Sequence, residues 1–175
     1  MPTTTRATLI RTYAILATIA GAIVALDQYT KFLVRTRLAL GEVWMPIDWL
    51  APYARVVHWT NTGAAFGLFQ NGNMVFTVLA IIVSAAIIYY YRDVGRASWL
   101  IRLALGLQLG GALGNLIDRL TRGTVTDFLS VGTFPVFNVA DSGISVGVAL
   151  LLVDMLIEQR RRPAPAEENP APHSP

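Results

Sequence analysis

Carboxylates are the side chains of this 175-residue sequence that are placed to do acid–base chemistry. The sequence has no cysteine, which excludes thiol nucleophiles, disulfides and cysteine-ligated metals. Its two histidines, His58 and His173, are too few for a zinc site or a serine–histidine–aspartate triad. Four aspartates within or near long apolar segments are candidates, Asp27, Asp118, Asp127 and Asp141, whereas Asp154 falls toward the end of its segment opposite to Asp141. Any chemistry in this protein therefore depends mainly on carboxylates.

Two carboxylates at a poorly hydrated site share one proton, because both cannot ionise there. Such a pair is the working part of an aspartic hydrolase. The ionised member takes a proton from water as the water attacks a peptide carbonyl, and the protonated member donates to the developing oxyanion. Spacing alone does not say which two of the four aspartates form the pair. A structural or transport role is equally compatible with the spacing.

Other polar residues lie beside these aspartates at helical spacing. Asp27 and Lys31 are four residues apart, so we expect them to share a helix face and to pair. Asn115, Asp118 and Arg119 also share one face of a predicted helix. Both groups predict polar contacts inside an otherwise apolar bundle.

Two further spacings predict how the helices pack and begin. Gly106, Gly110 and Gly114 recur every four residues, a pattern that lets a second helix approach closely. Asn138 precedes Asp141 by about one helical turn, so we expect the two residues to be hydrogen-bonded.

The elements that position these residues are predicted to be membrane helices. Hydrophobic residues make up 54% of the sequence and charged residues only 14%, against roughly 25% charged in a soluble domain. A spanning helix needs about 20 apolar residues. Four segments meet this length, at about residues 12–34, 74–91, 99–120 and 138–158. We therefore predict an all-α integral membrane protein, with one domain of four transmembrane helices in residues 1–162.

The basic residues predict the orientation of these helices. Arg6 and Arg11 before the first apolar run are also typical of a secretory signal peptide, but three further spans favour an uncleaved helix. The N-terminus, the second connection and the C-terminal end together carry eight Lys and Arg, and the other two connections carry six. We expect a multi-pass protein with both termini in the cytoplasm.

The segments outside the spans differ in character. Residues 35–73 contain Trp44, Trp49 and Trp59 and a β-like run at residues 55–60, which predicts an outward-facing interfacial segment with short β-strands between helices 1 and 2. Residues 163–175 are rich in proline and are expected to be disordered. The net charge is +3, but the basic residues do not form one patch, so no nucleic-acid partner is expected.

Four sequence blocks together resemble the lipoprotein signal peptidase family, the bacterial signal peptidase II proteins. The blocks are DQYTK at residues 27–31, NTGAAF at 61–66, GGALGNLIDR at 110–119 leading to VTDF at 125–128, and FNVADS at 137–142. The joint pattern is specific, whereas each block alone is weak.

The resemblance implies an aspartic endopeptidase of the bacterial inner membrane. It implies removal of signal peptides from prolipoproteins, with cleavage just before a cysteine that carries a diacylglyceryl group. It implies a catalytic dyad of Asp127 and Asp141, substrate-binding residues Asn61, Asn115, Arg119 and Asn138, and structural polar residues Asp27, Lys31 and Asp118. It further implies no metal or organic cofactor and inhibition by globomycin-type peptides. We also expect a monomer among membrane lipids, with its active site near the outer face.

Two other classes of protein are compatible with the same residues. A serine–lysine peptidase would use Lys31 as the base for Ser142 or Ser145. A carrier or assembly factor would use Asp118, Asp127 and Asp141 to relay protons or bind a cation. Transporters often contain repeated halves, and no internal repeat is visible in the sequence.

Overall fold

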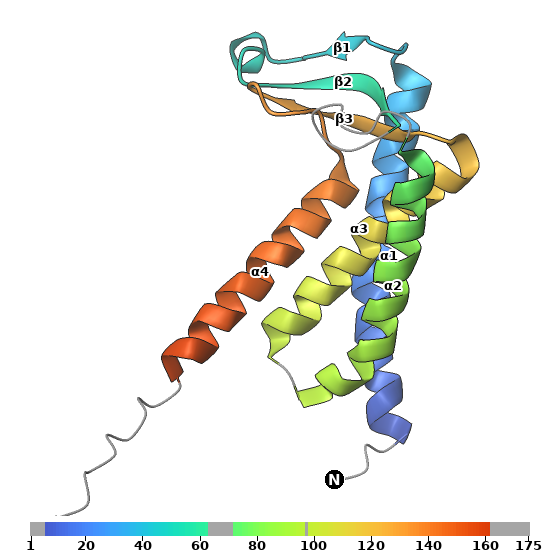
Figure 1. The fold of residues 1–175 in the computed structure, drawn as a ribbon. Coiled ribbons are helices and arrows are strands. Elements are labelled where there is room, and N and C mark those ends of the chain that lie inside the picture. The colour runs from blue at the N-terminus through green and yellow to red at the C-terminus, as the bar shows by residue number, and fades with distance from the viewer. Residues whose placement is uncertain (1–5, 63–71, 97, 162–175) are drawn as a thin grey trace, which may run out of the picture.

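The computed structural model describes residues 6–62, 72–96 and 98–161 (Figure 1). Its helices are α1 (Arg6–Arg37), α2 (Asn73–Tyr91), α3 (Trp99–Arg122) and α4 (Val139–Arg161), and its strands are β1 (Val43–Trp44), β2 (Ala54–Asn61) and β3 (Val125–Val131). Two short 3-10 helices, η1 (Asp48–Leu50) and η3 (Arg92–Arg96), complete these elements. The tail at residues 163–175, predicted to be disordered, lies outside the described residues, as does most of the block at residues 61–66.

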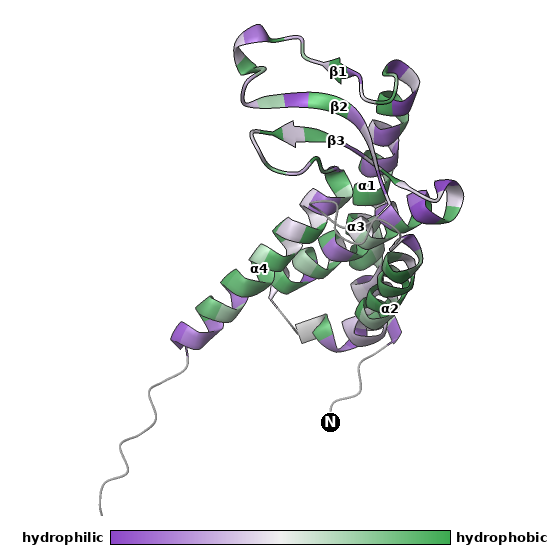
Figure 2. Cartoon of the chain, turned by 45° about the horizontal axis from the view of Figure 1, so that its top comes forward, coloured by the Kyte–Doolittle hydropathy of each residue, from purple (hydrophilic) through white to green (hydrophobic). Residues whose placement is uncertain are grey.

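The prediction of four membrane-spanning helices is confirmed. All four are long and apolar enough to cross a membrane. Large apolar side chains remain exposed along α2, such as Val78, Ile82 and Tyr90, and a helix that is apolar on its outer face fits contact with lipid tails. Hydrophobic residues dominate the middle of the helices and hydrophilic residues gather at helix ends, whereas the sheet contains both kinds (Figure 2).

Helix α3 is the centre of the bundle. Of its most apolar stretch 44% is buried, against 17% in each of the other three helices, and it packs against α1, α2 and α4. The glycine ridge explains the close packing, as its spacing predicted. A Cβ added at Gly110 would lie 2.7 Å from Ile23 Cβ and 2.8 Å from the Ala20 carbonyl oxygen of α1. Only a residue without a side chain allows α1 to lie this close.

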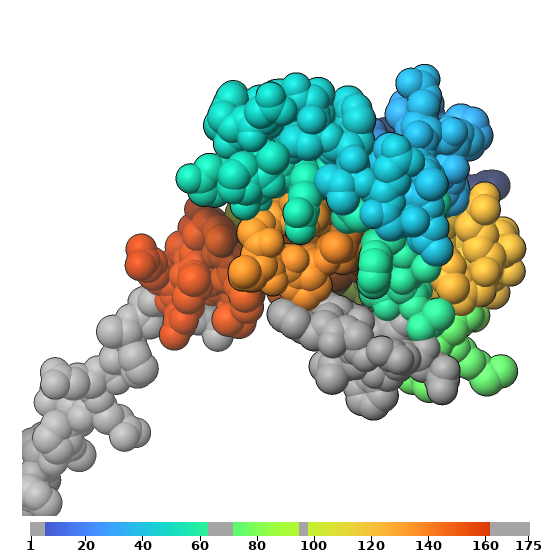
Figure 3. Space-filling model, turned by 90° about the horizontal axis from the view of Figure 1, so that it is seen from above, coloured from blue at the N-terminus to red at the C-terminus, as the bar shows by residue number. Residues whose placement is uncertain are grey.

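A three-stranded antiparallel sheet covers one end of the bundle, in the order β1-β2-β3. Strand β2 pairs with β3 so that Trp59 lies opposite Asp127 and Asn61 opposite Val125. Seen from above, the β1–β2 segment lies beside the residues that join β3 to α4, over the helix ends (Figure 3). The Arg6 end of α1 and the Arg161 end of α4 both lie at the end of the bundle away from the sheet (Figure 1).

Strand β3 is the element that sequence reasoning did not predict. Residues Val125 to Phe128 are buried on both faces of the strand, so the segment lacks the apolar–polar alternation of a half-exposed strand. The turn from α3 into β3 depends on Gly123, whose φ of +75° is strained for residues with a Cβ. The Gly123 N–H donates to the Arg119 carbonyl and closes the helix end.

Candidate active site

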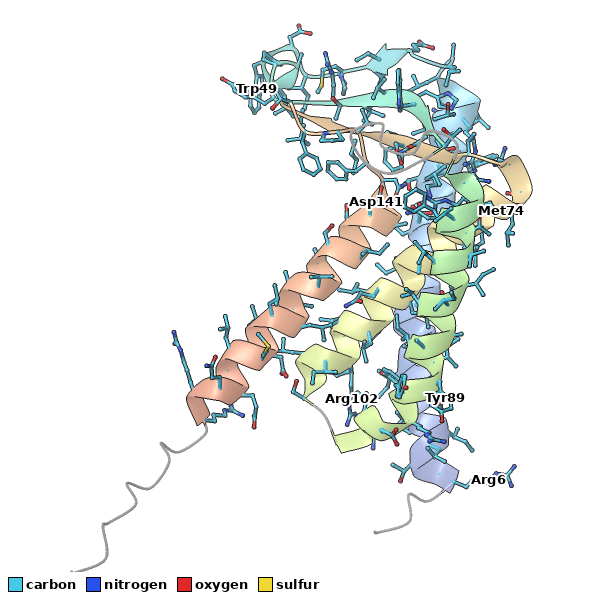
Figure 4. The ribbon with its side chains drawn as sticks, in the orientation of Figure 1. Arg6, Trp49, Met74, Tyr89, Arg102 and Asp141 are labelled. Carbon is cyan, nitrogen blue, oxygen red and sulfur yellow. The ribbon has the colours of Figure 1, made fainter. Side chains whose placement is uncertain are left out.

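Asp127 and Asp141 face the same cavity, which has a volume of about 550 Å³. Asp127 comes from β3 and Asp141 from the first turn of α4, at the end of the helix beneath the sheet (Figure 4). Three other predicted site residues, Asn61, Asn115 and Arg119, also line this cavity. The structure therefore brings together residues from β2, β3, α3 and α4 that lie far apart in the sequence.

The start of α4 fixes the position of Asp141. The Asp141 backbone N–H donates to Asn138 Oδ1 over 2.9 Å, and the Asn138 N–H donates to Asp141 Oδ2 over 3.2 Å. This reciprocal arrangement is a capping box, which satisfies N–H groups that the first helical turn leaves unpaired. The predicted hydrogen bonding between Asn138 and Asp141 is confirmed. The other carboxylate oxygen, Oδ1, accepts a hydrogen bond from Asn115 Nδ2 over 2.7 Å.

Strand pairing and two amide groups fix the position of Asp127. Asn61 of β2 lies diagonally across from Asp127 on β3, and its Nδ2 donates to Asp127 Oδ2 over 3.2 Å. Asn138 Nδ2 donates to the other oxygen, Oδ1, over 2.7 Å. Asn138 is fully buried beneath the cavity and thus contacts both aspartates.

The surroundings of Asp127 favour its protonated form. The pKa of its carboxyl group is raised from 3.8 to about 7, chiefly because burial penalises the charged form, and also because of the neighbouring charge of Asp141. The hydrogen bonds from Asn61 and Asn138 and the charge of Lys31 partly oppose this shift. A group with a pKa near 7 can exchange a proton at neutral pH.

A second buried polar cluster adjoins the two aspartates. Lys31 Nζ lies 2.8 Å from Asp27 Oδ2 and 3.3 Å from Asp118 Oδ2, and all three side chains are fully buried. The predicted pairing of Asp27 with Lys31 is confirmed. Arg35 adds a 3.5 Å contact to Asp118 Oδ1 and a hydrogen bond to Thr126 Oγ1. Neither Asp27, Lys31 nor Asp118 is among the residues that line the cavity.

The acids of this cluster hold the backbone beside the two cavity aspartates. Asp27 Oδ1 accepts the backbone N–H of Ala140 over 2.9 Å, and Asp118 Oδ2 accepts that of Thr126 over 3.0 Å. Ala140 and Thr126 immediately precede Asp141 and Asp127. Each cavity aspartate is therefore tied to the buried ionic cluster through the residue before it.

Arg119 supplies a positive charge to the cavity. Its guanidinium carbon lies 5.5 Å from the centre of the Phe76 ring, close enough for a cation–π interaction. Its Nε is buried and has no hydrogen-bond partner among the described residues. A buried donor without a partner is costly, so it is available to a carbonyl oxygen of a bound molecule.

Sequence reasoning missed the aromatic wall of the cavity. Phe76, Phe134 and Phe137 line it, and the rings of Phe134 and Phe137 stack edge to face with centres 5.8 Å apart. No spacing in the sequence distinguishes these rings from other apolar residues, because they come from α2 and from the connection after β3. They make the cavity largely apolar.

The geometry does not support a lysine base. Lys31 Nζ contacts Asp27, Asp118 and Asn115, whereas Ser142 Oγ donates to the Asn138 carbonyl. In the described ranges, no three His, Cys, Asp or Glu side chains are grouped to hold a metal ion.

A second hollow, of about 600 Å³, lies between the outer part of α1 and the sheet. Its lining includes Tyr29, Arg37, Trp44 and Phe128 but no carboxylate. It therefore cannot supply the paired acids that hydrolysis would need.

A helical membrane bundle in which a buried and a partly buried aspartate share one cavity has the architecture of a membrane-embedded aspartic peptidase. A profile of the Signal peptidase (SPase) II family matches residues 19–157. The chain belongs to the signal peptidase II family and is an aspartic peptidase.

Curated relatives agree with this assignment. The chain is 46% identical over 144 residues to the lipoprotein signal peptidase of Shouchella clausii, which covers 81% of this chain and 93% of that protein. It is 42% identical over 142 residues to the lipoprotein signal peptidase of Symbiobacterium thermophilum, covering 79% and 91% respectively.

Two solved structures, both described as bacterial membrane enzymes, have the same fold. The structure at 2.3 Å resolution has a TM-score of 0.78 at 29% identity and covers 87% of this chain and 94% of its own. The structure at 1.9 Å resolution has a TM-score of 0.72 at 31% identity and covers 81% and 92%.

Proposed function

We propose that this protein removes signal peptides from bacterial prolipoproteins, cutting before the diacylglyceryl-modified cysteine with Asp127 and Asp141 as the catalytic dyad. The observation that carries the proposal is the shared cavity, in which the buried carboxylate of Asp127 and the partly buried carboxylate of Asp141 are each held by amide N–H groups. The names of the curated relatives support the class of substrate.

Asp127 is the acid of the proposed reaction and Asp141 the base. The raised pKa of Asp127 supports its protonation at neutral pH. Asp141 lies in the first turn of α4, where the positive end of the helix dipole favours a negative charge. Asp141 takes one proton from water while the water oxygen attacks the peptide carbonyl carbon, and Asp127 gives its proton to the carbonyl oxygen. When the carbon–nitrogen bond breaks, Asp141 passes its proton to the leaving nitrogen and Asp127 recovers its own from the new carboxyl group.

The cavity matches a substrate that is itself held in the membrane. Phe76, Phe134, Phe137 and Ile144 give it apolar walls for acyl or apolar peptide groups. Among the polar lining groups, Arg119 Nε is placed to donate to a substrate carbonyl, and Asn61 and Asn115 hold the dyad. We assign substrate contacts to Asn61, Asn115 and Arg119 on this basis. The sequence prediction also gave Asn138 a substrate contact, but Asn138 is fully buried and does not line the cavity, so we propose that it holds the dyad instead.

The proposed location is the bacterial inner membrane, with both termini in the cytoplasm and the active site near the outer face. The cavity lies at the sheet end of the bundle, whereas Arg6 and Arg161 lie at the opposite end (Figures 1 and 4). Basic residues collect on the cytoplasmic side of membrane proteins. A site at the outer boundary meets the peptide bond beside a lipid-anchored cysteine at the right depth. We further propose that the protein acts as a monomer and that globomycin-type cyclic peptides occupy the same cavity.

The decisive experiment is cleavage of a diacylglyceryl-modified prolipoprotein by the purified protein in detergent. Asp127→Asn and Asp141→Asn keep the side-chain size and remove the titratable group. Asp154→Asn is the matched control, because Asp154 lies near the other end of α4 and bonds to Ser98 there.

Both dyad variants should lose cleavage while the control keeps it. A substrate with an unmodified cysteine should be cut far more slowly than the lipidated one. Normal cleavage by both dyad variants, or none by the wild type, would overturn the proposal.

A further inference from the structure

Lys31 contacts three of the groups that hold the proposed dyad or the backbone beside it: Asp27, Asp118 and Asn115. Its ammonium contacts Asp27 Oδ2 at 2.8 Å, Asp118 Oδ2 at 3.3 Å and Asn115 Oδ1 at 2.9 Å. An ammonium has three N–H donors, and these three contacts use them all. The side chain is fully buried, so no solvent competes for these donors.

The ammonium determines which way the Asn115 amide points. An ammonium donates hydrogen bonds but cannot accept them, so the amide oxygen of Asn115 must face Lys31. Asn138 Nδ2 donates to the same oxygen over 3.0 Å. The amide nitrogen of Asn115 is therefore left to face Asp141 Oδ1. A flipped amide would place two donors against Lys31 and an oxygen against the carboxylate of Asp141.

The orientation of the Asn138 amide is also fixed by its hydrogen bonds. Its Oδ1 accepts the Asp141 backbone N–H, so its Nδ2 is directed toward Asn115 Oδ1 and Asp127 Oδ1. Lys31 and Asn138 thus both donate to Asn115 Oδ1, and each amide also donates to one carboxylate of the dyad, Asn115 to Asp141 and Asn138 to Asp127. Because Lys31 fixes the Asn115 oxygen in this position, Asn138 must present its amide nitrogen there, which matches its donation to Asp127.

Lys31 also neutralises the two acids that hold the backbone before each dyad residue. Asp27 bonds to the N–H of Ala140 and Asp118 to that of Thr126. Without the ammonium, two buried carboxylates would lie close together, and Arg35 would be the one cation among the described residues still in contact with Asp118. Either acid would then be driven to change its protonation or position.

We propose that Lys31 is a positioning residue for catalysis: it orients the amides of Asn115 and Asn138 so that each dyad carboxylate faces an N–H donor. The inference rests on the proposed function of Asp127 and Asp141. It goes beyond a salt bridge that holds two helices together, because a purely structural ion pair would affect the amount of folded protein but not the behaviour of the folded enzyme.

The test compares Lys31→Met with Arg35→Met. Both changes remove one cation that contacts Asp118, but the contacts of the Arg35 side chain are with Asp118 and Thr126 rather than with Asn115. The rate and pH profile of prolipoprotein cleavage are measured per folded molecule.

The charged groups around Asp127 are Asp141 of α4, Arg119 and Asp118 of α3, and Lys31 of α1.

Lys31→Met should lower kcat by about 100-fold and leave KM nearly unchanged, because the Asn115 amide is then free to turn and Asp141 loses a fixed donor, a loss of the size seen when such a donor is removed. The fall in rate at alkaline pH should move to higher pH, because the positive charge of Lys31 lowers the pKa of Asp127. Arg35→Met should keep the wild-type kcat and profile in its folded fraction.

If Lys31→Met does not fold, the double variant Asp27→Asn with Lys31→Met removes one charge of each sign and keeps an oxygen for the Ala140 N–H. Its kcat should still fall about 100-fold.

A folded Lys31→Met enzyme with wild-type kcat and pH profile would overturn the inference. So would the same loss and shift in Arg35→Met. Failure of the proposed function is seen separately, as cleavage by Asp127→Asn or no cleavage by the wild type.

Discussion

The substitution Asp127→Asn should stabilise the fold at high pH while it abolishes catalysis. Asp127 has a pKa of about 7 in the folded protein, against 3.8 for a free aspartate. The unfolded chain therefore loses this proton at lower pH than the folded protein does. As a result, each unit of pH between 3.8 and 7 lowers the free energy of unfolding. At about 1.4 kcal/mol per unit, the folded protein is destabilised by roughly 4 kcal/mol above pH 7 and hardly at all at pH 4.

An asparagine at this position cannot ionise, so it removes the pH-dependent cost. It loses one hydrogen bond, because its amide nitrogen and that of Asn61 would both be donors, at a cost of about 1 kcal/mol. The net change in the free energy of unfolding should be a gain of about 3 kcal/mol at pH 8 and a loss of about 1 kcal/mol at pH 4.

The assay is reversible unfolding in mixed detergent micelles, followed by the fluorescence of the four tryptophans. Asp118→Asn is the matched control. It breaks the buried contact with Lys31 at 3.3 Å and should destabilise the protein at pH 8 by about 3 to 5 kcal/mol. The same Asp→Asn substitution is thus expected to raise the free energy of unfolding at position 127 and to lower it at position 118 at pH 8. An Asp127→Asn protein that is less stable than wild type at pH 8, or equally shifted at both pH values, would refute the reasoning.

Three further predictions follow from the same geometry. The single-turnover cleavage rate should fall above about pH 7, as Asp127 loses its proton, and a flat profile from pH 5 to 9 would contradict its role as the acid. Asn138→Ser should keep the cap of α4 but lose the donor to Asp127, which lowers the rate about 100-fold. Asn138→Ala should be about 1 kcal/mol less stable than the serine variant in chemical unfolding, and equal stabilities would count against the cap. Gly111→Ala would press a Cβ against the Ala140 carbonyl oxygen, so we expect a loss of about 1 to 3 kcal/mol together with reduced cleavage. Gly21→Ala, with nothing within 4 Å of the added Cβ, is its control: cleavage should stay at the wild-type rate, and stability should be unchanged or higher by up to about 1 kcal/mol because alanine favours a helix.

The sequence by itself determined the elements whose signals are local. Apolar runs of spanning length predict the four helices, because lipid requires every backbone group to be bonded within its own segment. The pairing of Asp27 with Lys31 and of Asn138 with Asp141 also follows from spacing within single helices or at a helix end. The glycine spacing in α3 likewise predicted a close helix contact, although not that α1 is the partner.

The tertiary structure decided which carboxylates meet. The spacing of the four candidate aspartates did not show which two form the catalytic pair, and only the family resemblance indicated Asp127 and Asp141. In the fold, Lys31 forms ion pairs with Asp27 and Asp118, whereas Asp127 and Asp141 face the cavity. The contacts of Lys31 with Asn115 and Asp118 join α1 to α3 across more than eighty positions of the sequence, so no local pattern encodes them.

Strand β3 shows most clearly what the sequence could not determine. Its burial on both faces removes the alternation that marks a strand, and its hydrogen bonds are with β2, far away in the chain. That pairing directs Asp127 toward the cavity and places Asn61 beside it. The proposed acid of the reaction is therefore set by a long-range contact, whereas the proposed base is set by the cap of its own helix.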